Sequence, residues 1–338
     1  MIQQPSEISE SVGRFTFNRT LERDMIHRSA VSEVFITDYT AIDDDNWLVG
    51  AQLPTAHAYY GDVWAGGLSS CPLVLLLECC RQAATYGSYS RFGNAADTVN
   101  MIKSIEIDVP DIGNIEFGDM PVQLVIAVEA TDVVVKNGVR KAATPRVSIF
   151  HDGSQIGTAS IPVALASKRL FESLRRRQRG SNPPTTKSLP FERPSAPVEA
   201  ADLGLSNVEN VVIAHPRFAT HALVTELALL GSNKSLLDHE YDHVPAMALI
   251  EGARQTAILA ARECWPLSQY DAIVHLSLKA VFGQFAEVDE CTEFEARIPT
   301  SPRADIRTTF EVRARQGSGI VAEFQFGFQP AGGAPAGR

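Results

Sequence analysis

Two long apolar stretches divide the chain into two similar halves, and both have the length and composition of a helix. The first begins at Pro72, a residue that suits the first turn of a helix, and is predicted to end near residue 88 or 91. The second is predicted to run from about Ala246 to Glu263 and to stop near Pro266. Runs rich in β-branched and aromatic residues lie before and after each stretch, and these runs predict strands.

In each half the runs predict a hairpin before the helix and three or four antiparallel strands after it. One helix wrapped by one antiparallel sheet is the hotdog layout, so the pattern predicts an α+β fold with two hotdog domains in tandem. A single hotdog leaves one sheet edge open, and the two copies are therefore expected to pair edge to edge as an intramolecular pseudo-dimer. The predicted strands are residues 30–39, 47–53, 99–109, 122–135, 139–150, 155–165, 222–229, 235–241, 272–282, 293–298, 306–315 and 320–328.

Changes in composition along the chain predict its boundaries. Residues 1–20 are polar and predict a flexible N-terminus. Residues 167–206 are rich in Pro and Arg and predict a linker, and the Gly/Pro/Ala-rich residues 330–338 predict a disordered tail. The N-terminal hotdog domain is therefore expected at residues 21–166 and the C-terminal one at residues 207–329.

The composition also limits where the protein works and what it binds. Of the 338 residues 45% are hydrophobic and 21% charged, which is ordinary for a globular protein. The net charge of -10 argues against general nucleic-acid binding. No apolar run is long enough to span a membrane, and the polar N-terminus lacks a signal-peptide core. The five cysteines are odd in number and lack the spacing of a metal site, which favours the reducing cytoplasm.

The pentad E-x-x-R-Q occurs once in each predicted helix. Residues at i, i+3 and i+4 share one face of a helix, so each copy places a carboxylate, a guanidinium and an amide on one patch of an apolar helix. A buried charge is costly unless it is paired, so each copy is either part of a polar site or an internal ion pair. The first pentad contains Glu78, Arg81 and Gln82, and the second contains Glu251, Arg254 and Gln255.

The residues before the second helix resemble part of a known catalytic motif. Pro245-Ala246 and Glu251 have the Pro-small-x4-Glu spacing of the hotdog dehydratases of fatty-acid synthesis. In those enzymes a His precedes the Pro, and its place falls here on Leu237. The nearest imidazoles are His239 and His243, so ordinary dehydration is not the favoured reading.

As a whole the chain resembles the A-factor biosynthesis (AfsA-like) hotdog family, the synthases of γ-butyrolactone autoregulators. The resemblance covers about residues 25–328, and its most specific part is the pairing of two E-x-x-R-Q helices. Two positions depart from the family pattern: Cys71 stands where an Asp is usual, and Ala246 where a Gly is usual. The residues that carry the resemblance are His27–Asp38, Pro72-Leu73 with the first pentad, and Asp242-His243-Val244-Pro245 with the second.

The resemblance implies an acyltransferase of γ-butyrolactone or butenolide signal biosynthesis. Such enzymes move a β-ketoacyl group from an acyl-carrier-protein thioester to the hydroxyl of dihydroxyacetone phosphate, and the ester then cyclises. The implied partners are the acyl carrier protein and dihydroxyacetone phosphate, with no metal or organic cofactor, no nucleic acid and no membrane. Two alternatives stay open: a hotdog acyl-thioester hydrolase or dehydratase, and a non-catalytic protein that binds a lipid or lactone.

This reaction needs a base for the hydroxyl and hydrogen-bond donors for the developing oxyanion. The second pentad is favoured over the first because it keeps the Asp-His-x-Pro sequence before its helix. The basic run 175–179 is expected either to dock an acidic carrier protein or to be a solvated linker. The candidate catalytic residues are Glu78, Glu251 and His243, and the candidate substrate-binding residues are Arg81, Gln82, Arg254, Gln255, Asp242 and His57.

Overall fold

The computed structural model of the chain describes residues 15–62, 72–92, 98–115, 120–266, 272–300 and 302–331. These residues fall into two compact units. The first unit comprises Met1–Ala56 and Ser70–Arg177, and the second comprises His57–Ser69 and Gln178–Arg338. Cys71, most of the predicted flexible N-terminus and all but the first two residues of the predicted tail lie outside the described residues.

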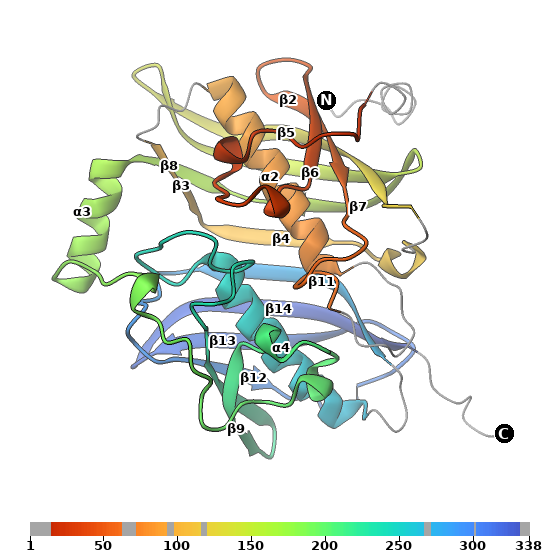
Figure 1. The fold of residues 1–338 in the computed structure, drawn as a ribbon, viewed down its shortest axis with the longest axis vertical. Helices are drawn as coiled ribbons and strands as arrows, with labels where there is room; N and C mark the ends of the chain where they lie inside the picture. The colour runs from red at the N-terminus through yellow and green to blue at the C-terminus, as the bar shows by residue number, and fades with distance from the viewer. Residues whose placement is uncertain are drawn as a thin grey trace. The chain divides into compact units, whose positions relative to one another are not determined.

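In the first unit a long helix lies against an antiparallel sheet (Figure 1). The helix is α2 (Leu73–Phe92), and it packs on β1, β2, β5 and β6. The sheet order is β1-β2-β5-β6-β7-β4, and β8 pairs with both β6 and β3. The strands are β1 (Ile36–Ala41), β2 (Asn46–Gln52), β3 (Thr98–Ile102), β4 (Ser104–Asp108), β5 (Gln123–Lys136), β6 (Val139–His151), β7 (Ser154–Ser160) and β8 (Val163–Ser167).

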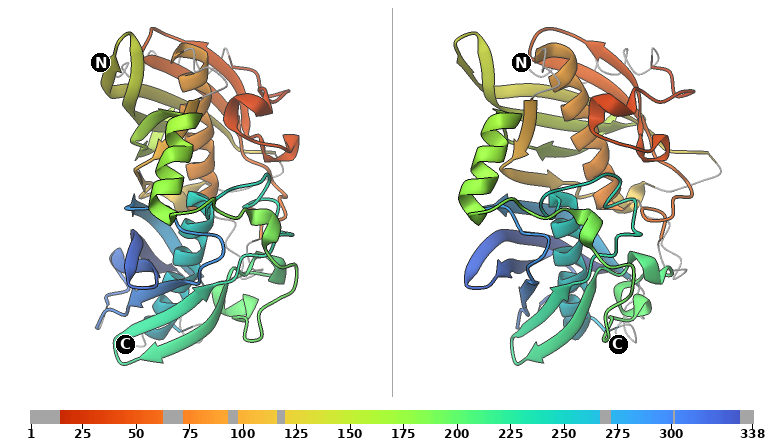
Figure 2. Two further views of the ribbon diagram at one scale, coloured as in Figure 1. Left: turned by 90° about the vertical axis from the view of Figure 1, so that its left-hand side faces the viewer. Right: turned by 60° about the vertical axis from the view of Figure 1, so that its left-hand side comes forward.

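The second unit has the same combination of one long helix and one antiparallel sheet. Its helix is α4 (Ala246–Cys264), which packs on β9 to β14. The sheet order is β11-β14-β13-β12-β10-β9. Turned views show α2 and α4 each on one face of the sheet of its own unit (Figure 2). The strands are β9 (Ile213–Ala219), β10 (Ala222–Leu227), β11 (Ala272–Phe282), β12 (Thr292–Arg297), β13 (Thr308–Gln316) and β14 (Gly319–Ala331).

The two long helices are buried along most of their length because most of their side chains are apolar or small. In α2 the close fit is visible at Trp47 of β2, whose indole N–H donates to the carbonyl of Ala83 at 3.0 Å. In α4 it is visible at Gly252, where a Cβ would lie 2.4 Å from the ring of Phe294. Within the described residues no helix combines the length and the apolar character that crossing a membrane requires.

The close approach at Gly252 gives a first prediction. Replacing Gly252 with Ala is expected to destabilise the protein by about 1–3 kcal/mol, because the added methyl group forces Phe294 out of a packed core. Urea unfolding followed by fluorescence measures the change. The matched control is Gly283→Ala, because a Cβ at Gly283 meets nothing closer than 3.7 Å. Equal stability of both variants and the wild type would contradict the packing described for α4.

The structure departs from the predicted elements at several places. The predicted strand 30–39 begins only at Ile36, because Val31–Glu33 is a 3-10 helix, and the predicted strands 99–109 and 155–165 are each two strands. The predicted strand 235–241 is wrong, since these residues form turns in which the side chain of Asn233 accepts a hydrogen bond from the backbone N–H of Leu236. Strand β9 was not predicted. Within the predicted linker the chain forms a helix, α3 (Lys168–Arg179). Short 3-10 helices lie at Arg23–Ile26, Val31–Glu33, Ile112–Asn114, Thr186–Ser188, Ala200–Leu203 and Val208–Asn210.

Candidate active site

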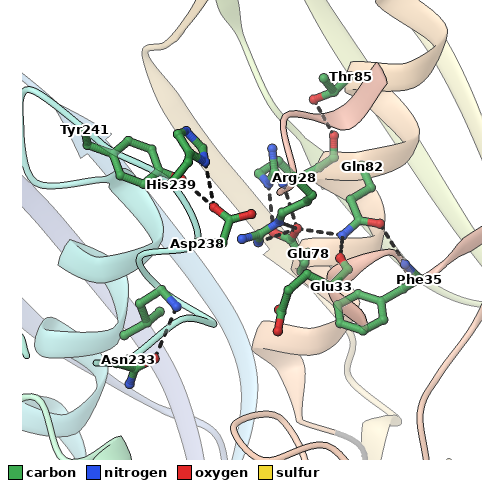
Figure 3. Close-up of polar contacts among 12 residues, drawn as sticks. Arg28, Glu33, Phe35, Glu78, Gln82, Thr85, Asn233, Asp238, His239 and Tyr241 are labelled. Carbon is green, nitrogen blue, oxygen red and sulfur yellow. Dashed lines mark hydrogen bonds and ion pairs between the residues drawn. The ribbon is translucent and has the colours of Figure 1, made fainter. Parts of the chain in front are cut away.

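Glu78 of the first pentad is fully buried and is held by two arginines (Figure 3). Arg81 donates from Nε to Oε2 and from Nη2 to Oε1, both at 2.7 Å, which is a two-pronged contact. Arg28, from the segment before β1, donates from Nη2 to Oε1 at 2.6 Å. Gln82 adds a third donor at 2.8 Å. The first pentad is therefore an internal ion pair completed by Arg28.

These contacts keep Glu78 ionised. Burial alone would raise the pKa of its carboxyl, but the charges of Arg28 and Arg81 and the hydrogen bonds from Arg81 and Gln82 outweigh burial and lower the pKa to about 2. Both oxygens of this carboxylate are occupied by hydrogen bonds from Arg28, Arg81 and Gln82. The geometry therefore favours a structural role for Glu78 over the predicted role in proton transfer.

The second pentad repeats the two-pronged contact on α4. Arg254 donates from Nε to Oε2 of Glu251 at 2.8 Å and from Nη2 to Oε1 at 2.7 Å. Gln255 donates to Oε1 at 2.7 Å. Burial lowers the pKa of Arg254, but the charge of Glu251 and its hydrogen bonds raise it by more, so the guanidinium stays charged. Glu251 is 1% exposed, and its two oxygens are already engaged in these bonds.

The glutamine has the same backbone role in both pentads. Gln82 donates to the carbonyl of Glu33 at 2.7 Å and accepts from the N–H of Phe35 at 2.9 Å, as Figure 3 shows. Gln255 donates to the carbonyl of Asn210 at 2.7 Å and accepts from the N–H of Val212 at 2.9 Å. In each unit the amide thus fixes two backbone groups, two residues apart, on the segment that leads into the first strand of that unit.

The third partner of the glutamate differs between the pentads. Where Glu78 meets a second arginine, Glu251 meets the phenol of Tyr59. Burial, and then the charge of Glu251, raise the pKa of Tyr59 well above its usual value, so the phenol keeps its proton and donates toward the carboxylate. Sequence analysis did not single out Tyr59, which precedes Glu251 by most of the chain length.

Tyr59 reaches Glu251 because a short segment, here called the strap (His57–Asp62), belongs to the second unit. Asp62 anchors the strap: it accepts from the backbone N–H groups of Ser206 at 2.9 Å and Asn207 at 3.0 Å. The side chain of Asn210 ties both ends, donating to Asp62 at 2.8 Å and to the carbonyl of Ala58 at 2.7 Å. The strap is therefore held in the second unit by these four hydrogen bonds, three of them partly buried.

His57, a predicted substrate-binding residue, lies at the start of the strap. Its Nδ1 accepts from the backbone N–H groups of Tyr59 and Tyr60, both at 3.2 Å. This bonding shapes the turn that presents Tyr59. A direct contact of His57 with substrate stays a prediction.

Arg254 has donors that Glu251 does not use. Within the described part of the chain, no residue accepts a hydrogen bond from its Nη1. The side chain is 16% exposed, so these N–H groups are not sealed in the core. A guanidinium fixed on one edge by a carboxylate and open on the other presents a fork of donors to an anion. Arg254 is therefore the residue of the second pentad best placed to hold a phosphate or an oxyanion.

His275 lies within electrostatic reach of Arg254 and was not predicted as a site residue. Burial and then the charge of Arg254 lower the pKa of this imidazole to about 3, so the ring is neutral at physiological pH. Its Nε2 lies 3.1 Å from the carbonyl oxygen of Ser277. The corresponding first-half residue, found by aligning the two pentads, is Ile102, which carries no such chemistry.

Two Asp-His pairs precede α4. The predicted residues Asp242 and His243 contact each other, with Oδ1 2.6 Å from Nδ1, and the ring of His243 packs edge-on against Phe285. Asp238 and His239 form a similar pair at 2.7 Å, visible in Figure 3. A carboxylate at Nδ1 orients an imidazole. The structure therefore supplies oriented imidazoles at this place.

The cysteines of α2 are core residues. Cys79 and Cys80 are both fully buried, and burial raises the pKa of the Cys80 thiol well above its usual value. A thiol in such surroundings is a poor nucleophile. Within the described residues these two cysteines therefore serve the packing of α2.

The comparison with protein families adds the decisive observation. The family model described as the A-factor biosynthesis hotdog domain matches residues 12–166 and 188–330. The chain belongs to this family. Both pentads lie within the matched residues, and the matched domain has the hotdog fold.

Named relatives agree with this assignment to the A-factor biosynthesis hotdog family, and a solved structure shares the fold. The chain is 27% identical over 290 residues to the 2-oxo-3-(phosphooxy)propyl 3-oxoalkanoate synthase of Streptomyces virginiae, which covers 85% of this chain and 90% of that protein. It is 28% identical over 239 residues to the synthase of the same name from Streptomyces griseus, covering 70% and 74%. The crystal structure of a putative oleoyl thioesterase from Lactobacillus plantarum superposes with a TM-score of 0.52 at 12% identity, covering 86% and 98%, which is a likeness of fold alone.

Proposed function

We propose that this chain is an acyltransferase that moves a β-ketoacyl group from an acyl-carrier-protein thioester to the hydroxyl of dihydroxyacetone phosphate. The name of its relatives supports this reaction. A 2-oxo-3-(phosphooxy)propyl group is the carbon skeleton of dihydroxyacetone phosphate, and a 3-oxoalkanoate is a β-ketoacyl group. Their ester is the precursor expected of γ-butyrolactone and butenolide signals. Exchange of a thioester for an ester involves no redox step.

One observation supports particular residues for this reaction. Arg254 pairs with a buried carboxylate and still has guanidinium N–H groups that this carboxylate does not use. A planar, charged set of donors suits a phosphate, and Arg254 supplies one that Glu251 holds in place at 2.7 and 2.8 Å. Gln255 fixes the carboxylate in turn. In this arrangement Glu251 orients Arg254, and Arg254 binds the phosphorylated alcohol.

The remaining candidates fall into two groups. His243 with Asp242 supplies an oriented imidazole before α4, so we retain His243 as a proton-transfer candidate and Asp242 as its partner. The first pentad has a different character, because two guanidinium groups hold Glu78 ionised. We therefore assign Glu78, Arg81 and Gln82 to the support of the first unit and place the chemistry in the second.

We further propose that the two units are hotdog domains in tandem that form an intramolecular pseudo-dimer. Each unit has one long helix on an antiparallel sheet, and each uses the pentad glutamine to hold two backbone groups two residues apart. Such detailed agreement is expected of a duplicated unit. The proposed domain limits are 21–166 and 207–329, with residues 167–206 between them.

We propose helix α3 as the docking surface for the carrier protein. In the basic run 175–179, Arg175 is buried and Arg179 is bound to Asp289 at 2.5 Å and to Glu287 at 3.1 Å. These two side chains are thus engaged within the protein. The exposed cations of α3 are Lys168, Arg169, Arg176 and Arg177, next to the exposed apolar side chains of Leu170 and Leu174. An acidic partner with an apolar patch complements this helix.

Reversing charge on α3 tests the docking surface. The double variant Arg169→Glu/Arg177→Glu is expected to raise KM for a carrier-protein thioester by about tenfold, because rim charges steer an acidic partner. With a small soluble thioester as donor, KM is expected to stay unchanged. The control is Arg303→Glu, which reverses an exposed charge of the second unit that is not on α3. Equal KM values for the carrier thioester in wild type and double variant would contradict docking at α3.

The proposed reaction is tested by mass spectrometry of the products. Purified protein is incubated with a β-ketoacyl thioester and, separately, with dihydroxyacetone phosphate, glycerol 3-phosphate, dihydroxyacetone or no acceptor. We expect the phosphorylated ester to form with dihydroxyacetone phosphate, and thioester consumption to depend on it. Loss of thioester with free acid as the product would instead identify a hydrolase. Binding without consumption would identify a lipid- or lactone-binding protein.

A further inference from the structure

We propose that His275 is the group that accepts the proton of the attacking hydroxyl in the second unit. This inference rests on the proposed acyl transfer and adds a catalytic residue to it. The inference starts from a gap in the site: neither pentad glutamate is free to act as a base. Glu78 is held by two guanidinium groups, and both oxygens of Glu251 accept from Arg254.

The hydrogen bonding of His275 fixes which ring nitrogen is basic. The carbonyl oxygen of Ser277 can only accept, so Nε2 of His275, 3.1 Å away, must carry the proton. In a neutral ring the lone pair then lies on Nδ1. Within the described residues Nδ1 has no hydrogen-bond partner. The side chain is partly buried, so this lone pair is available to a small bound molecule.

A distortion of the sheet presents the ring. In the pairing of β11 with β14, His275 lies opposite Phe328 and Ser277 lies opposite Gly327, so Leu276 is an extra residue on β11. This is a β-bulge, a device that re-aims a side chain and is frequent beside active sites. The bulge depends on Gly327, because a Cβ there would lie 2.2 Å from Oγ of Ser277. The sequence therefore accommodates the bulge on both strands.

The surroundings of His275 suit a base that works beside a bound phosphate. The imidazole packs against the rings of Phe326 and Phe328, at centroid distances of 5.5 and 5.0 Å. Arg254 is the charged group that acts on it from α4. Burial, the larger cause of the low pKa of His275, remains when the acceptor binds, but a phosphate on Arg254 offsets the second cause, the positive charge, and so raises the pKa of the imidazole. Binding of the acceptor thus prepares the base that activates it.

The proton and the bonds balance in this step. The hydroxyl oxygen of the acceptor attacks the thioester carbonyl carbon, and its proton passes to Nδ1 of His275. Collapse of the tetrahedral intermediate breaks the carbon–sulfur bond. The imidazolium then returns the proton to the departing thiolate, so the histidine is neutral before and after each turnover.

The test compares His275→Ala and His275→Gln with the wild type in the acyl-transfer assay. We expect kcat to fall about 100-fold or more, the usual contribution of a general base, with KM for dihydroxyacetone phosphate changed by less than about threefold. Added imidazole is expected to restore part of kcat in His275→Ala and none in His275→Gln. A merely structural role would not be rescued. The control His221→Ala removes an exposed imidazole and is expected to keep full activity.

A second measurement separates this inference from the proposed function. In protein labelled with 15N-histidine, the Nδ1 signal missing from His275→Gln belongs to His275, and its chemical shift is expected to be that of an unprotonated nitrogen. Adding dihydroxyacetone phosphate alone should move it. An unmoved signal, or kcat retained within about threefold in His275→Ala, would overturn the role of His275. Absence of any ester product with a moved signal would overturn the proposed transfer and leave His275 as a ligand-contacting residue.

Discussion

Replacing Arg254 with Gln is expected to lower kcat/KM for acyl transfer by about 100- to 1,000-fold, the usual cost of removing a charged donor from an enclosed site. Its guanidinium is the group of the second pentad with donors left over after it has paired with Glu251. Steady-state kinetics with dihydroxyacetone phosphate as the varied substrate measures the effect. Arg254→Lys keeps the charge but loses the planar fork, so it should recover only a small part of the activity.

The control for Arg254 must separate catalysis from folding, because Arg254→Gln leaves the buried carboxylate of Glu251 without its partner. The double variant Glu251→Gln/Arg254→Gln removes both charges and is expected to be more stable than Arg254→Gln alone. It should nevertheless remain inactive. A folded double variant with wild-type activity would show that the pair is a structural element and that the phosphate binds elsewhere.

Replacing Glu78 with Gln is expected to destabilise the first unit by about 3 kcal/mol at pH 7, from the depression of its pKa to about 2. The carboxylate is ionised above about pH 4.5 in the unfolded chain but down to about pH 2 in the folded one. Its stabilisation is therefore fully present above pH 4.5 and is lost as the pH falls from 4.5 toward 2. Urea unfolding of wild type and variant at pH 7.5, 5 and 4 measures this dependence.

The difference in stability between wild type and Glu78→Gln should be equal at pH 7.5 and 5 and smaller at pH 4. Asp305→Asn is the matched control, since Asp305 forms an exposed ion pair with Arg303 and should change stability little. A stability difference that does not shrink at pH 4 would show that packing, and not the charge of Glu78, accounts for the loss.

The long helices and most strands could be predicted from the sequence because each has a local pattern of apolar, β-branched or aromatic residues. Both apolar helices and most strands were found close to their observed limits; β11 (Ala272–Phe282) was placed correctly at both ends. The failure at 235–241 has a physical cause. Leu236 and Leu237 are buried, as in a strand, but Asn233 bonds the backbone into turns. A buried turn and a buried strand both contain apolar residues, so these residues alone cannot distinguish the two.

The site was predicted only as far as it is local in sequence. Glu251, Arg254 and Gln255 share one helical face and were found by their spacing. Tyr59 was missed because its contact depends on a strap that belongs to the second unit, although it precedes α2 in the chain. His275 was missed because the bulge that presents it is set by the pairing of β11 with β14. Neither long-range contact leaves a periodic signal.

The two pentads show how one motif can take two roles. In both, an arginine grips a buried glutamate and a glutamine ties the glutamate to the backbone. The two pentads differ in the residue that comes from outside the helix. Arg28 adds a second positive charge at Glu78. Tyr59 adds only a neutral hydroxyl at Glu251, which therefore pairs with a single arginine. We propose that a duplication supplied the scaffold, and that residues outside the motif distinguish a supporting copy from a functional one.

The most direct test of this account compares the acceptor with and without its phosphate. The ratio of kcat/KM for dihydroxyacetone phosphate to that for dihydroxyacetone is measured in the wild type and in Arg254→Gln. The account predicts a ratio of about 100 or more in the wild type, because the phosphate alone engages the fork, and a ratio close to one in the variant. A variant that keeps the wild-type preference for the phosphorylated acceptor would contradict the assignment of Arg254 as the phosphate anchor.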